Sequence, residues 1–136
     1  MNAIDAARKF VAEVCDYPDH LSLSEDILCK IRITGDDTDE FMIEFGERFD
    51  VDLSNYHWYF HTEEEGYSIG SLFFKSLDRR VARIPITLEI LANSIETKKW
   101  SVDYPEHTLP PFRKDLAVDR TLVIVALIFA IWVFFF

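Results

Sequence analysis

The feature that most constrains this chain is an apolar run, TLVIVALIFAIWVFFF, which occupies residues 121–136. Its sixteen residues carry no charge, and apolar side chains would cover every face of a helix, whereas a surface helix of a soluble domain keeps a polar stripe. In hydrocarbon a backbone must satisfy its own hydrogen bonds, as a helix does. The run therefore predicts a helix that crosses a lipid bilayer.

The length of the run agrees roughly with this interpretation. A helix rises ~1.5 Å per residue, so the run spans roughly 24 Å of a ~30 Å hydrocarbon core. Local thinning of the bilayer and extension of the Arg120 side chain toward the headgroups would absorb the difference. A buried helix or a dimer seam is the alternative for a run this short. We expect a single transmembrane anchor over residues 117–136, with lipid around residues 121–136.

The charge of the chain limits its partners. The formal net charge is −10, and all of it lies in residues 1–120. Nucleic-acid binding needs clustered Lys and Arg to neutralise phosphates, so we expect no nucleic-acid partner. A protein partner with a basic surface suits such a domain better.

Targeting signals and cysteines indicate a cytoplasmic domain. The N-terminal sequence MNAIDAARKFVAEV lacks the apolar core of a signal peptide. Cys15 and Cys29 are isolated thiols, which fits a reducing compartment. Basic residues ahead of a span favour the cytoplasmic side, and here they are Arg113, Lys114 and Arg120. We expect a tail-anchored, single-pass protein whose N-terminal domain faces the cytoplasm.

Hydrophobic periodicity predicts a small helical bundle ahead of the anchor. Thr34 and Thr87 stand at candidate N-cap positions, and Asp37 completes a capping-box variant with Thr34. The expected helices cover about residues 2–15, 36–49, 67–78 and 88–98. The predicted fold class is therefore all-α.

The prolines divide the chain into three parts. Pro105, Pro110 and Pro111 fall within residues 101–116, and a segment of this composition is typical of a semi-rigid linker. The expected organisation is a helical domain over residues 1–100, a linker over residues 101–116 and a transmembrane helix over residues 117–136.

No common catalytic motif is present in the sequence. It contains no nucleotide-binding loop, HExxH, GxSxG or Cys-x-x-Cys pattern. His57 and His61 are four residues apart with Glu64 nearby, which on a helix would place two metal ligands on one face. Two ligands do not make a site, and the aromatic residues around them are typical of a core. We expect no metal site, no catalytic residues and no enzyme activity.

Residues 35–53, GDDTDEFMIEFGERFDVDL, resemble the second helix of acyl carrier proteins. In those proteins an Asp-Ser-Leu turn opens an acidic amphipathic helix that ends in a Phe and alternating acidic and apolar residues. Counting back from Phe49, the modified Ser of a carrier corresponds to Gly35, its preceding Asp to Thr34 and its following Leu to Asp36.

A closer resemblance is to a bacterial, acyl-carrier-like family of unknown function, domain of unknown function family 1493. It rests on the pattern Gly-Asp-Asp-x-Asp-Glu-Phe, then Phe-x-Val-Asp-Leu, then a Leu-rich helix and Tyr-Pro-Glu-His-Thr-Leu. These pieces are residues 35–41, 49–53, 88–100 and 104–109. The resemblance would cover about residues 1–110. It implies an acyl-carrier-like bundle in the bacterial inner membrane, to which the terminal span is an addition.

The residue at the carrier's attachment position determines the expected function. Gly35 has no hydroxyl, so it cannot carry phosphopantetheine, and we expect no cofactor. Asp36 and Asp37 instead place carboxylates at the positive end of the helix, where each is worth ~0.3–1 kcal/mol. Our leading hypothesis is a docking module that presents an acidic face to a protein partner, namely Asp36, Asp37, Asp39, Glu40, Glu44 and Glu47.

Three other hypotheses remain open. One is a genuine acyl carrier protein modified at a non-standard residue, such as the nearby Thr34 or Thr38. A second is an enzyme that uses His57 or His61 as a base beside a Glu. A third is a purely structural module that self-associates through its apolar tail.

Overall fold

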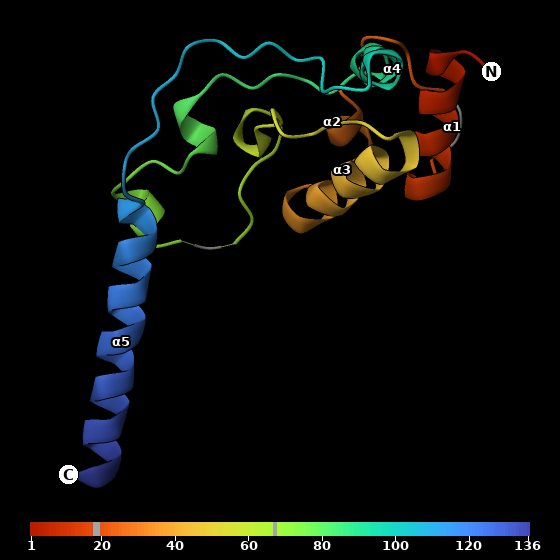
Figure 1. Ribbon diagram of the computed structural model, residues 1–136. Helices are drawn as coiled ribbons and strands as arrows, with labels where there is room; N and C mark the ends of the chain where they lie inside the picture. The colour runs from red at the N-terminus through yellow and green to blue at the C-terminus, as the bar shows by residue number, and fades with distance from the viewer. Residues whose placement is uncertain (18–19, 67) are drawn as a thin grey trace.

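Amphipathic helices of unequal length build the domain (Figure 1). The computed structural model describes residues 1–17, 20–66 and 68–136. The α-helices are α1 (Ala3–Cys15), α2 (Ile27–Ile31), α3 (Gly35–Phe49), α4 (Leu88–Thr97) and α5 (Lys114–Phe135), and three short 3₁₀ helices are η1 (Trp58–Phe60), η2 (Gly70–Leu72) and η3 (Asp78–Arg80). The expected helices over residues 2–15, 36–49 and 88–98 are thus confirmed as α1, α3 and α4.

Side-chain caps begin three of these helices. Asn2 accepts from the backbone N–H of Asp5 at 2.8 Å, which satisfies one of the free N–H groups of the first turn of α1. Asp26 caps α2 in the same way. The predicted cap at Thr87 is confirmed, because its hydroxyl accepts from the N–H of Ile90 at 3.2 Å.

The core lies where α1 crosses α3 and α4. The ring of Phe10 packs against the rings of Phe41, Phe45 and Phe49 with centroids 5.1–5.6 Å apart. Such aromatic pairs add to the stabilisation that burial itself provides. α1 also packs along α4, which contributes the buried side chains of Leu88, Leu91 and Ala92.

One backbone bridge ties the end of α3 to the end of α4. The N–H of Asp52 donates to the carbonyl of Lys98, and the N–H of Trp100 donates to the carbonyl of Asp52, both at 3.0 Å. This parallel pairing of Asp52 with Lys99 is isolated. The described part of the chain contains no strand, so the structure is mostly helical, as predicted.

The predicted helix over residues 67–78 is wrong. Within this range the described residues form the single turn of η2 and, further on, the start of η3; Tyr67 lies outside the described residues. The apolar residues that suggested the helix do not enter a core: Leu72 is 79% exposed and Phe73 is 73% exposed. Helical spacing would place them on one face, but in the structure both side chains are largely exposed.

α5 extends away from the domain (Figure 1). Its 22 residues are long and apolar enough to cross a membrane, and none of its most apolar window is buried in the protein. At ~1.5 Å per residue the helix is roughly 33 Å long, and its uncharged part from residue 121 onward spans roughly 22 Å of a ~30 Å hydrocarbon core. It begins at Lys114, three residues inside the segment expected as a linker.

Candidate functional site

The six acidic residues predicted for docking all lie on α3. Asp36, Asp37, Asp39, Glu40 and Glu47 are exposed and Glu44 is half-buried. They occupy the side of α3 opposite its buried residues, Thr38, Phe41, Met42 and Phe45. The helix thus separates its charges from its core face, and a negative surface runs along most of its length.

One of these carboxylates is engaged within the domain. Glu44 accepts from the Arg48 guanidinium at 2.7 Å, and Arg48 also donates to Glu13 on α1 at 2.8 Å. Exposed pairs of this kind add little stability, but they neutralise one end of the acidic surface. Among the described residues, no ion pair involves the remaining five carboxylates.

The N-terminus of α3 differs from the sequence-based expectation. Thr34 occupies the N-cap position, but its side chain makes no capping hydrogen bond, so its predicted capping role is wrong. Its hydroxyl donates instead to Oε1 of Glu65 at 2.9 Å. The first N–H of the helix, that of Gly35, donates to the hydroxyl of Thr62 at 3.3 Å. A loop distant in sequence therefore provides the cap.

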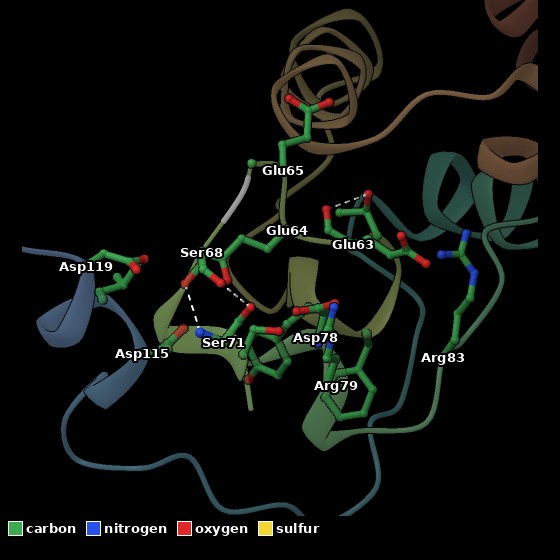
Figure 2. Close-up of a pocket in the computed structure, with 16 residues that line it drawn as sticks. Glu63, Glu64, Glu65, Ser68, Ser71, Asp78, Arg79, Arg83, Asp115 and Asp119 are labelled. Atoms are coloured by element: carbon green, nitrogen blue, oxygen red, sulfur yellow. Dashed lines mark hydrogen bonds between the residues drawn. The ribbon is translucent and has the colours of Figure 1, made fainter. Parts of the chain in front are cut away.

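Gly35 is confined by the same loop. Its φ of +52° lies in the left-handed region that favours glycine, and a Cβ placed there would overlap the Glu65 side chain. Figure 2 shows Glu65 extending to the end of α3. A carboxylate of the protein itself therefore lies at the helix end that would otherwise attract a phosphate. Gly35 and Glu65 are thirty positions apart and no local sequence pattern links them, so sequence reasoning missed this contact.

The hydroxyl groups near this helix end are also engaged. Thr38 is fully buried, and its hydroxyl lies 3.5 Å from that of Thr62. Thr34 is exposed but bound to Glu65. An arm attached at Thr38 would have to displace the loop, whereas an arm at Thr34 would have to displace only the Glu65 carboxylate.

A polar cavity of about 380 Å³ lies between this loop and the start of α5. Figure 2 shows Ser68 and Ser71 on the loop near Asp115 and Asp119 of α5. Arg113 joins two of the lining residues by donating to Glu64 at 2.8 Å and to Asp115 at 2.9 Å. The charged residues that line the cavity are Glu63, Glu64, Glu65, Asp78, Asp115, Asp119, Arg79 and Arg83. This excess of carboxylates suits neither a phosphate nor an apolar acyl chain.

His61 and Tyr104 form a buried hydrogen-bond network. The Tyr104 hydroxyl accepts from the indole N–H of Trp100 at 2.8 Å and from the backbone N–H of His57 at 3.2 Å. Both of its acceptor positions are then used, so its proton is donated to His61 Nε2, 2.7 Å away. His61 Nδ1 in turn donates to the carbonyl of Ile84 at 2.7 Å. This arrangement requires neutral His61.

The network determines the state of His61, the second histidine of the candidate pair. Burial lowers the pKa of His61 to about 4, because charging the ring inside the domain is costly. Both of its nitrogens are engaged, and His57 lies before the 3₁₀ helix η1 rather than on an α-helix. The described residues contain no group of three or more side chains that could hold a metal ion.

Comparison with known families places most of the chain in a family. The family described as "Protein of unknown function (DUF1493)" matches residues 5–103, a range that runs from the first turn of α1 to just beyond α4. No curated protein and no solved structure matches the chain. Since the match covers well over half of the sequence, the chain belongs to the DUF1493 family.

Proposed function

We propose that this protein is a membrane-tethered, acyl-carrier-like docking module that lacks a phosphopantetheine arm and binds a protein partner through the acidic face of α3. It is not an enzyme in this proposal. α5 holds the domain at the bacterial inner membrane, and the basic residues ahead of the apolar run favour a cytoplasmic domain.

The observation that carries the proposal is the Glu65 carboxylate over Gly35. A carrier needs a free hydroxyl at this position and room for a phosphate at the helix end. In this protein the position is Gly35, which has no side chain, and Glu65 fills the space at the helix end. The first N–H of α3 is bound to Thr62. The acidic face beside it is open to a partner, because five of its six carboxylates are exposed.

The acidic face favours a partner with a basic groove. Complementary charges raise the association rate and orient the partner. The carboxylates are distributed along one side of a fifteen-residue helix, which matches an elongated basic surface better than a single cationic side chain. Binding of this kind weakens as salt rises, because exposed charges are screened beyond ~8 Å at physiological ionic strength.

A site-specific photocrosslinker tests the docking face in native membranes. We expect a crosslinker at Glu40 on α3 to capture a defined partner, whereas one at the exposed Glu96 on α4 should not. Adding Asp36→Lys and Asp37→Lys should lower the yield at residue 40 roughly tenfold, a loss of about 1.4 kcal/mol. The matched control is Glu89→Lys with Glu96→Lys. Equal loss in both double variants would contradict a specific acidic face.

The intact mass of the native protein tests the missing arm. We expect the measured mass of the protein to contain no contribution from phosphopantetheine. An added arm would overturn the proposal in favour of an acyl carrier modified at a non-standard residue. Fragmentation would then locate the arm, and Thr34 is the exposed hydroxyl nearest to the carrier position.

A further inference from the structure

Large apolar side chains are exposed side by side at η2. Ile69 is 53% exposed, Leu72 79%, Phe73 73% and Phe74 37%. Exposed apolar residues scattered singly are normal on a soluble domain, as with Ile43 on α3, but a contiguous cluster marks an interaction surface. We call residues 69–74 the apolar loop.

The apolar loop is held against the first turns of α5. The N–H of Gly70 donates to Oδ1 of Asp119 at 2.9 Å. Gly70 also lies so close to the backbone of Asp115 that a Cβ would overlap that carbonyl oxygen. In Figure 1 the yellow-green segment of η2 lies beside the start of α5. These contacts therefore fix the position of the apolar loop along the axis of α5, just before the apolar part of the helix.

That position corresponds to the headgroup layer of a bilayer. Asp119 precedes Leu122 by three residues, or about 4.5 Å along the axis of α5. The polar layer on each side of a ~30 Å hydrocarbon core is roughly 5–8 Å deep. If Leu122 is among the first side chains in hydrocarbon, the apolar loop lies at the boundary between headgroups and acyl chains.

The surroundings of the loop are less acidic than the rest of the chain. Residues 63–83 and 112–120 carry seven Lys or Arg and six Asp or Glu, a net charge of +1, whereas the chain as a whole carries −10. Of these acids, Asp115 is bound to Arg113 and Asp119 to Gly70. Lys114 lies over the ring of Phe74, 5.7 Å from its centroid. Basic side chains near a membrane surface are attracted to its anionic headgroups.

From these observations we infer that the apolar loop inserts into the headgroup boundary of the same bilayer that α5 crosses. The occupant of this surface is lipid: apolar side chains of residues 69–74 contact the upper acyl chains, and the surrounding Lys and Arg contact anionic headgroups. Two adjacent anchors would restrict rotation of the domain on its membrane. The inference rests on the membrane tether of the proposed function.

Depth-dependent quenching in reconstituted vesicles tests the inference on the full chain. Single cysteines are introduced by Phe73→Cys, Ile43→Cys and Val125→Cys in a Cys15→Ala, Cys29→Ser background and labelled with an environment-sensitive fluorophore. The vesicles contain equal parts phosphatidylcholine and phosphatidylglycerol, with spin-labelled lipids quenching near the headgroup or at the chain end. We expect the probe at 73 to be quenched at least twofold more than that at 43 by the shallow label, and the probe at 125 to be quenched by the deep label.

The two failures are distinguishable. If the deep label quenches the probe at 125 but the shallow label does not quench the probe at 73, the inference is overturned and the tether stands. An unquenched probe at 125 would overturn the tether. Phe73→Cys removes an exposed side chain, so it should fold; as a second variant, Gly70→Ala should release the loop from α5 and reduce the quenching of the probe at 73.

Discussion

The bundle of α1, α3 and α4 and the segment from residue 55 to residue 83 differ in how they use aromatic residues. In the bundle, Phe10, Phe41 and Phe45 are almost fully buried and contact each other ring to ring. In the segment, Phe60 and His61 are buried, whereas Phe73 faces outward. Helical periodicity thus identifies a core only where a second element covers the apolar face.

The two regions also differ in where their backbone hydrogen-bond partners lie in the sequence. Each bundle helix satisfies its own backbone and needs caps only at its ends. The segment has three single turns of 3₁₀ helix, so its polar groups depend on distant partners, such as Ile84, whose N–H donates to the carbonyl of Phe60 at 2.7 Å. Stability of the segment therefore depends on contacts that span the sequence.

The largest expected difference concerns Phe45 and Phe73. Phe45→Ala removes a fully buried ring from the bundle and should lower the free energy of unfolding by about 3–5 kcal/mol. Phe73→Ala removes a ring that is 73% exposed and should change it by less than about 0.5 kcal/mol. Urea unfolding of the full chain in micelles, followed by near-ultraviolet circular dichroism, measures both. Equal losses would mean that the apolar loop belongs to the core.

A second difference concerns the pH dependence that His61 confers. Its folded pKa of about 4 lies below the ~6.5 of an unfolded histidine, so the unfolded chain binds the proton first as pH falls. The stability that neutral His61 contributes is fully present above pH ~6.5 and is lost by pH ~4, a change of about 3 kcal/mol in the free energy of unfolding. His61→Gln should flatten the stability profile between these limits, measured by urea unfolding. The control is His20→Gln at an exposed histidine, and equal flattening in both variants would show that the effect does not come from the buried His61.

A third, smaller effect should appear at Gly70. Gly70→Ala forces a Cβ against the backbone of Asp115, and overpacking of this kind costs typically about 1–3 kcal/mol. The cost should be local, so hydrogen exchange should accelerate in residues 68–74 but not in α1. Gly46→Ala on α3 is the control, because its Cβ would meet mainly the movable side chain of Leu53. Faster exchange in α1 would show that the two regions unfold together.

The smallest effect is expected at Glu65. Glu65→Gln removes the charge from the N-terminus of α3 and a charged acceptor from Thr34, which should cost about 0.3–1 kcal/mol. Glu63→Gln in the same acidic run is the matched control, and thermal unfolding at low salt compares the two. No difference between them would mean that the Glu65 carboxylate contributes no helix-end stabilisation.

The sequence predicted local features well where the interaction was local. α1, α3, α4 and the Thr87 cap follow from residues three or four positions apart, and the apolar run predicts α5 by composition alone. It failed at residues 67–78, where Leu72 and Phe73 share a face that the domain leaves uncovered. It also failed at Thr34, because the group that competes for its hydroxyl comes from residue 65, thirty-one positions away.

The sequence by itself determined the helical bundle, the acidic face of α3 and the helix that is long and apolar enough to cross a membrane. These features depend on periodicity, charge and hydropathy, which adjacent residues specify. Only the tertiary structure decided that Glu65 covers Gly35, that Tyr104 holds His61 neutral and that Gly70 rests against α5. Each of these contacts joins residues thirty or more positions apart, and chain closure over such distances follows from packing of the whole domain rather than from any local preference.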